Sequence, residues 1–213
     1  MNIQEETFFY REMTEKIAEV IESSLSEGAI YQEGIILWDY PISILNDELA
    51  IDWTFEVVKD ETLRKNDYVL SASAGANESD MPSIHIFITL PKGSWVKKHN
   101  VCPAALRGVI AHEIHHLAQN SEESNFFSES HSLIKKIDNA RVSYLLCSLE
   151  IEAFKIGARA ESFYSGKPQR EIMLEYLMTF DMCKDDASQI ADVWMSTSFP
   201  AFKENLRRSN AND

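Results

Sequence analysis

The chain has 213 residues, of which 45% are hydrophobic and 10% aromatic, a composition sufficient to bury the core of a single globular domain. Acidic residues outnumber basic ones 34 to 20, and the resulting net charge of -14 argues against binding to nucleic acid or to an anionic membrane. Three widely spaced cysteines, an acidic start without a signal-peptide pattern, and the lack of an apolar run of about 18 residues predict a cytoplasmic protein with no membrane span.

The first half of the chain predicts one helix followed by a small sheet. Apolar residues recur every four positions over 3–26, and Gly28 ends this helix. The apolar period then changes to two, which predicts strands with one buried face. These strands cover 35–38, 49–58, 68–70 and 84–90. The polar segment 74–82 is expected to form a turn region, and the connections are too short for crossover helices, so the sheet should be antiparallel or mixed.

The second half of the chain is predicted to be helical. Pro103 suits the first turn of a helix, and Gly166 and Pro168 together form a strong signal for the end of one. The expected helices begin at 103 and cover 139–165, 168–182 and 186–196. The predicted fold class is therefore α+β. The single domain spans 1–208, with a helix-plus-sheet half at 1–102, a helical half at 103–208 and a frayed tail at 209–213.

Residues 111–116 read A-H-E-I-H-H and contain the pattern H-E-x-x-H as His112, Glu113 and His116. Positions i and i+4 lie one above the other on a helix, so both imidazoles can reach one tetrahedral ion at about 2.0–2.1 Å. Glu113 lies next to the first ligand, where it can take a proton from a water molecule on the ion. The pattern predicts a zinc site with Glu113 as general base. His115, inside the pattern, is expected to support the site or to lie on the surface.

A third ligand is needed to complete a catalytic zinc site. Glu122 has the right spacing for a third ligand on the same segment, but Gln119 occupies the position where a glycine must bend the chain. The second long helix offers Glu150 and Glu152. Glu150 shares a face with the small residues Ala153 and Gly157, which would let that helix approach the histidine helix closely. Glu152 shares its face with basic residues and is interpreted as part of a solvated surface, so the sequence favours Glu150.

The combination of H-E-x-x-H with a glutamate on a later helix resembles the gluzincin metallopeptidases, and the segment 144–153 is similar to the E-x-E-A stretch of small zincin-like proteins, many encoded by phages. The resemblance implies a zincin-like fold, a zinc ion held by His112, His116 and Glu150, and a peptide or protein substrate lying along an edge strand, here expected at 83–90. It also implies an aspartate that orients a ligand histidine. Phe154 occupies that position, so another group must orient the imidazoles.

Two alternatives remain open at this point, and the first belongs to another class of protein. One is a structural or interaction protein that keeps a relic of the metal site, and the other is a regulatory peptidase with one specific protein target. Several further residues attract attention without a spacing argument that selects among them. They are Cys147 near the expected glutamate ligand, His85 on a strand, and His131, Tyr144 and Tyr164 as candidate donors to an oxyanion.

Overall fold

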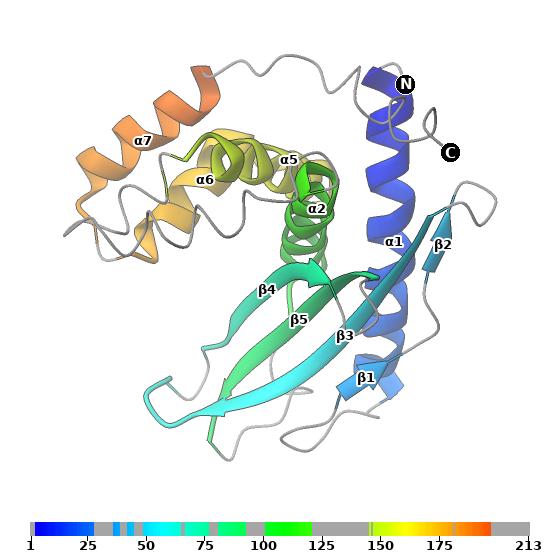
Figure 1. The fold of residues 1–213 in the computed structure, drawn as a ribbon. Coiled ribbons are helices and arrows are strands. Elements are labelled where there is room, and N and C mark those ends of the chain that lie inside the picture. Colours follow the sequence, from blue (N-terminus) through cyan, green and yellow to red (C-terminus); the bar gives the residue numbers. More distant parts are fainter. Residues whose placement is uncertain are drawn as a thin grey trace.

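A computed structural model describes residues 3–27, 36–38, 42–44, 49–64, 67–76, 81–92, 101–120, 145, 147–180 and 182–196. Within these residues the chain forms five helices and five strands in the order helix, sheet, helices, which confirms the predicted α+β class (Figure 1). The elements are α1 (Ile3–Glu27), β1 (Ile36–Trp38), β2 (Ile42–Ile44), β3 (Leu49–Asp60), β4 (Val69–Ala76), β5 (Pro82–Pro91), α2 (Pro103–Asn120), α5 (Ser148–Ser165), α6 (Gln169–Met178) and α7 (Lys184–Ser196).

The sheet is mixed, with the strand order β1-β3-β5-β4 and with β2 also paired to β3. β3 and β5 run parallel, whereas β4 pairs antiparallel with β5. The last strand along the chain, β5, therefore lies inside the sheet, and β4 is an edge strand within the described residues. The prediction that 83–90 is the edge strand was wrong, because the β4–β5 hairpin folds back and inserts β5 between β3 and β4.

β4 is longer than the sequence suggested. The expected strand at 68–70 continues to Ala76, and the predicted turn region overlaps it at residues 74–76. The segment S-A-S-A-G-A has few of the β-branched and aromatic side chains that favour strands. Its strand conformation comes from pairing with β5, where Ala72 lies opposite Ile86 and Ala74 opposite Ile84. Tertiary pairing here overrides a weak local signal.

The first hydrophobic core lies between the sheet and two helices. α1 and α2 cover the same face of the sheet, as Figure 1 shows. The alternating residues of β3 and β5 are buried as the period of two predicted, and α2 contributes Leu106, Ile110 and Ile114. An ion-pair cluster joins the two helices, because Arg107 on α2 contacts the carboxylates of Glu15 and Glu22 on α1.

The remaining helices, α5, α6 and α7, enclose a second hydrophobic core that includes Leu145 and Trp194. α5 ends at Gly166, which has a φ of 73° and donates its N–H to Ser162 O, as expected for a glycine that stops a helix. The part of the predicted helix that precedes 145 lies outside the described residues, as do Gly28 and the tail at 209–213. None of the described helices has the length and apolar character that a membrane crossing requires.

α2 and α5 approach each other closely, and two glycines make this possible. A Cβ atom added at Gly157 would lie 2.7 Å from the backbone oxygen of Gly108, a distance that no real side chain tolerates. Ala153, one turn earlier on α5, is fully buried. The expectation that the small-residue face of α5 allows a close helix contact is confirmed. This contact brings Glu150, on the same face, next to α2.

Candidate metal centre

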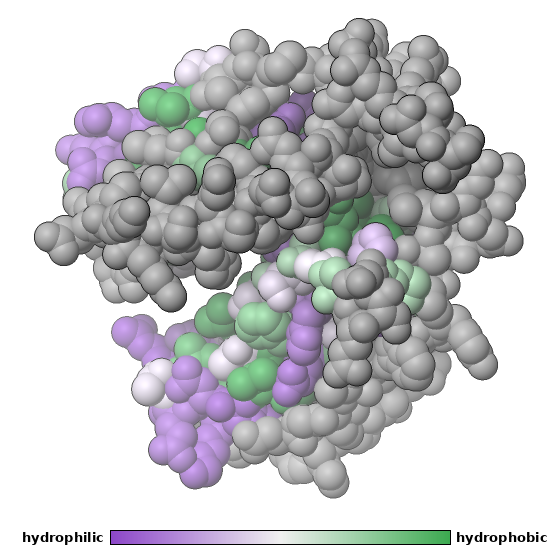
Figure 2. Space-filling view, viewed as in Figure 1, coloured by the Kyte–Doolittle hydropathy of each residue, from purple (hydrophilic) through white to green (hydrophobic). Residues whose placement is uncertain are grey.

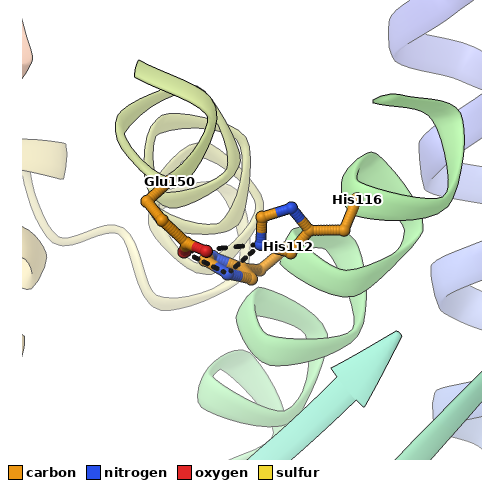
Figure 3. Close-up of side chains that lie close together, drawn as sticks. All are labelled: His112, His116 and Glu150. Carbon is orange, nitrogen blue, oxygen red and sulfur yellow. Dashed lines mark hydrogen bonds and ion pairs between the residues drawn. The ribbon is translucent and has the colours of Figure 1, made fainter. Parts of the chain in front are cut away.

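α2 makes contacts on two opposite faces. Its apolar stripe packs against the sheet, and the opposite face carries His112 and His116 toward α5. The two histidines are one turn apart, so their rings lie one above the other, and their Nε2 atoms are 3.0 Å apart (Figure 3). His112 and His116 are both buried, with 9% and 8% of their residue surface exposed. The expected helical context of H-E-x-x-H is therefore present.

Glu150 from the first turn of α5 completes a group of three possible ligands. Its Oε2 atom is 3.6 Å from Nε2 of His112 and 3.4 Å from Nε2 of His116. Figure 3 shows the carboxylate and both rings pointing toward one another from the two helices. Among the described residues this is the one group of three or more His, Cys, Asp or Glu side chains that could hold a metal ion.

The geometry of these three residues fits a small divalent cation. Their ligand atoms are separated by 3.0, 3.4 and 3.6 Å, and a tetrahedral ion with bonds of about 2.0–2.1 Å keeps its ligands about 3.3 Å apart. The Oε2 atom of Glu150 is buried and makes no hydrogen bond of normal geometry with the described residues. A buried carboxylate oxygen in this position is costly unless a cation compensates it.

The electrostatics of the group also favour positive charge. Burial raises the pKa of Glu150, but the two nearby imidazoles outweigh this effect and bring it down to about 2. Burial lowers the pKa of His116, whereas Glu150 and Glu113 raise it, and the net result is a raised pKa. Positive charge between the rings and the carboxylate is thus stabilised, and a bound metal cation would supply that charge.

Gln119 orients His116, a role that the sequence did not assign to any residue. Its Oε1 atom lies 2.8 Å from Nδ1 of His116, and its Nε2 donates to Leu149 O and to Glu152 Oε2 at 3.2 and 3.1 Å. With Nδ1 of His116 donating to this oxygen, Nε2 is left as the atom that can bind a metal. Gln119 therefore also ties the histidine helix to α5.

Glu152 belongs to the same buried network and is not part of a solvated surface, so that interpretation was wrong. Its carboxylate is half-buried and lies 3.4 Å from Nε2 of His115, which is only 1% exposed. Burial raises the pKa of Glu152, but His115 and Gln119 more than offset this and lower it. Glu150 faces His112 and His116, and Glu152 contacts His115 and Gln119 behind them. His115 accordingly lies in the layer behind the site and does not join the group of possible ligands.

Phe154 packs against His112 instead of forming a hydrogen bond with a ligand. The two ring centroids are 4.5 Å apart, and Phe154 stacks in turn on Trp194 with a centroid distance of 4.7 Å. A stack of aromatic rings restricts the ring of His112 by packing. The resemblance places an orienting aspartate at this position. The chain instead holds one histidine by an amide on its own helix and the other by an aromatic stack.

Glu113 lies beside β4, which is an edge strand of the described sheet, and contacts the backbone N–H of Ala74. Its Oε1 atom is 4.0 Å from Nε2 of His112, and its side chain is almost fully buried. Burial and the negative charge of Glu150 raise the pKa of Glu113 more than His112, His116 and the backbone N–H of Ala74 lower it. A carboxylate that is next to a candidate ligand histidine and is itself outside the group of possible ligands has the position required of a general base.

A pocket of about 200 Å³ opens beside these residues and is lined by His112, Glu113 and Tyr176, by residues 70–72 of β4, and by apolar side chains of α2, α5 and α6. In the space-filling view the surface is hollowed next to the sheet (Figure 2). Tyr176 is the functional candidate that the sequence analysis missed. Burial and the charges of Glu150 and Glu113 raise the pKa of Tyr176, so its hydroxyl keeps its proton.

The other residues considered from the sequence lie elsewhere. Tyr164 hydrogen-bonds to Glu15 on α1, and His85 lies 3.1 Å from Glu56 on the neighbouring strand, so neither lines the pocket. Cys147 is half-buried before α5 and is not in the group of possible ligands. His131, Tyr144 and Glu122 lie outside the described residues.

No protein-family model, curated protein or solved structure matches this chain. The case for a function therefore rests on the residues of the site and on their geometry.

Proposed function

We propose that this protein is a zinc-dependent metallopeptidase of the gluzincin type. The observation that carries the proposal is the meeting of His112, His116 and Glu150 at separations suited to one tetrahedral ion, with Glu113 beside them and a pocket in front. Two imidazoles and one carboxylate form a ligand set that suits zinc and leaves a coordination position open for chemistry.

When bound, the zinc ion would polarise the substrate carbonyl and lower the pKa of a water molecule to about 7. The chain's own residues supply the rest of the reaction. Glu113 takes a proton from the attacking water as the water oxygen forms a bond to the carbonyl carbon. The same carboxyl group then gives a proton to the departing amine nitrogen as the C–N bond breaks.

Tyr176 is proposed as the donor to the developing oxyanion. Its ring packs against Phe154, with centroids 4.5 Å apart, and it lines the same pocket as His112 and Glu113. A neutral phenol donates a hydrogen bond, whereas a phenolate cannot, so the raised pKa suits this role. No hydrogen bond from its hydroxyl to another described residue competes with a bound carbonyl group.

β4 is proposed to bind the peptide as an added strand. It is an edge strand of the described sheet, and residues 70–72 line the pocket next to the metal centre. An edge strand offers unpaired backbone groups to an extended peptide. This assigns the substrate strand to 69–76 instead of 83–90. The acidic charge and the three free cysteines fit a cytoplasmic peptidase that acts on peptides or proteins.

The decisive experiment compares wild-type protein with Glu113→Gln and with Glu19→Gln, the same substitution at an exposed position on α1. Cleavage of casein or of a peptide library is measured with added zinc, and bound metal is measured by mass spectrometry. We expect Glu113→Gln to keep its metal and to lose about 10²- to 10⁴-fold in activity, with Glu19→Gln unchanged. Metal bound by wild-type protein without any cleavage would refute the peptidase and favour a structural role for the site.

Metal content provides the second test. Protein purified without chelator should contain about one zinc ion per chain. His112→Ala and Glu150→Ala should each lose most of it, because either change removes one of three protein ligands. A zinc content unaffected by both substitutions would refute the assigned ligand set.

A further inference from the structure

The pocket continues past the metal centre along the groove between α2 and α5. His112 and Glu113 line one end of the pocket. Gly108 also lines it and lies one turn earlier on α2, about 5–6 Å away along the helix axis. The walls of this extension are aliphatic, formed by Val109, Ile172 and Met173. The proposed chemistry leaves this part of the pocket without a role.

A single carboxylate, that of Glu161, lines this extension. Because Gly108 has no side chain, Glu161 can lie directly against α2. A Cβ atom at position 108 would be 3.1 Å from Cβ and 3.2 Å from Oε2 of Glu161. Glu161 is half-buried and, among the described residues, its carboxylate makes no hydrogen bond or ion pair.

Within the part of the chain that the structure describes, the charge of Glu161 is poorly compensated. Lys167 has an electrostatic effect on it, but the ammonium group of Lys167 is bound to Glu175 at 2.7 and 2.8 Å. Burial and the negative charge of Glu175 raise the pKa of Glu161. The described residues that line the pocket include two glutamates and no lysine or arginine. A cation entering the pocket would therefore relieve an unfavourable charge.

We propose that this extension is a specificity pocket for a lysine or arginine side chain of the substrate, with Glu161 binding the charged group. The aliphatic walls would contact the stem of such a side chain, and the carboxylate at the level of Gly108 would receive its ammonium or guanidinium group. The inference rests on the proposed peptidase function for the position of the scissile bond, which lies at His112 and Glu113.

The alternative occupant of an apolar pocket is an uncharged aliphatic side chain. Such a side chain would bury the carboxylate of Glu161 without a partner, which is unfavourable. A ligand that forms a hydrogen bond between two charged groups binds about 10- to 100-fold more tightly than an uncharged analogue of similar shape. The overall charge of -14 would also attract cationic peptides.

Binding provides a test that does not require cleavage. The probes are N-acetyl-lysine methylamide, N-acetyl-norleucine methylamide, and norleucine methylamide with a free amino group, titrated by NMR. The proteins are wild type, Glu161→Gln, and Glu171→Gln as a matched control on the exposed face of α6. We expect wild type and Glu171→Gln to prefer the acetylated lysine probe over acetylated norleucine by about 10- to 100-fold. Glu161→Gln should lose this preference.

Equal binding of the two acetylated probes, or no binding of the lysine probe, would overturn the cation pocket. Tighter binding of the free-amine probe would overturn its assignment to a side chain and transfer the site to a peptide amino terminus. Retention of the lysine preference in Glu161→Gln would also refute the role of Glu161.

Cleavage of acetylated peptides with lysine or norleucine beside the scissile bond separates this inference from the proposed function. If the wild type cleaves both peptides with equal kcat/KM, the peptidase stands and the cation pocket fails. If it binds the lysine probe selectively and cleaves no peptide, the cation pocket stands and the peptidase fails. If both proposals hold, Glu161→Gln lowers kcat/KM for the lysine peptide alone, by about 10- to 100-fold, and Glu113→Gln abolishes cleavage of both.

Discussion

Substitution of Gly157 by alanine tests the close contact on which the whole site depends. In an unobstructed helix this change would stabilise the protein by about 0.8–1 kcal/mol, because alanine has the higher helix propensity. Here the new Cβ atom would lie 2.7 Å from the backbone oxygen of Gly108 and 3.3 Å from Cβ of His112. A backbone carbonyl cannot rotate away, so the two helices must separate.

Overpacking of this kind costs about 1–3 kcal/mol. After the gain in helix propensity is subtracted, we expect a net loss of up to about 2 kcal/mol in the free energy of unfolding, measured by urea denaturation. Separation of α2 from α5 would also move Glu150 away from His112. Zinc affinity, measured by competition with a chelating dye, should therefore fall together with stability.

Gly75→Ala is the matched control for this prediction. An added Cβ atom at Gly75 meets no described atom within 4 Å, so the substitution should stabilise the protein by about 0.4–1 kcal/mol and leave zinc affinity unchanged. If Gly157→Ala proved as stable as the wild type, with the same affinity for zinc, the proposed close packing of α2 on α5 would be refuted.

Three further substitutions test separate parts of the structure. Gln119→Leu removes the hydrogen bond to Nδ1 of His116 and should weaken zinc binding by about 10- to 100-fold, and an unchanged affinity would show that the ring is held by other contacts. Tyr176→Phe should lower kcat by about 10²- to 10³-fold with metal content unchanged, whereas full activity would rule out this donor. Arg107→Leu leaves two carboxylates of α1 without their partner, but these are partly exposed and can rehydrate. The substitution should therefore lower the free energy of unfolding, measured by urea denaturation, by about 1–2 kcal/mol, and an unchanged value would show that the ion pairs are screened by solvent.

Local patterns in the sequence predicted much of the arrangement around the site. The spacing of His112 and His116 fixes their common face on a helix, and the face shared by Glu150, Ala153 and Gly157 identified which glutamate would face these two histidines. Both inferences use only the period of an α-helix. The burial of alternate residues on β3 and β5 followed from the period of a strand in the same way.

Features that depend on contacts between distant segments could not be read from such patterns. The sequence gives no sign that β5 inserts beside β3, because register and strand order depend on the whole sheet. Tyr176 lies 26 positions after Glu150 and reaches the site only through the packing of α6 on α5. In the sequence, Gln119 stands where the longer H-E-x-x-H-x-x-G-x-x-H pattern has a glycine. That comparison says nothing of the ability of Gln119 to orient His116 one turn away. The spacing of i and i+3 could have revealed it.

The location of the site between two cores explains how this chain can position His112, His116 and Glu150 without an orienting aspartate. α2 is fixed on one side by the core it shares with the sheet and α1, and α5 is fixed by the core it shares with α6 and α7. Each core therefore orients one part of the proposed ligand set, and the contact of Gly108 with Gly157 sets the distance between the two helices. Gln119 connects the two parts directly, since it contacts His116 on its own helix and both Leu149 and Glu152 on α5. An ion bound by residues of both helices would bind only when α2 and α5 are in contact. Its binding free energy would therefore add to the stability of the folded protein.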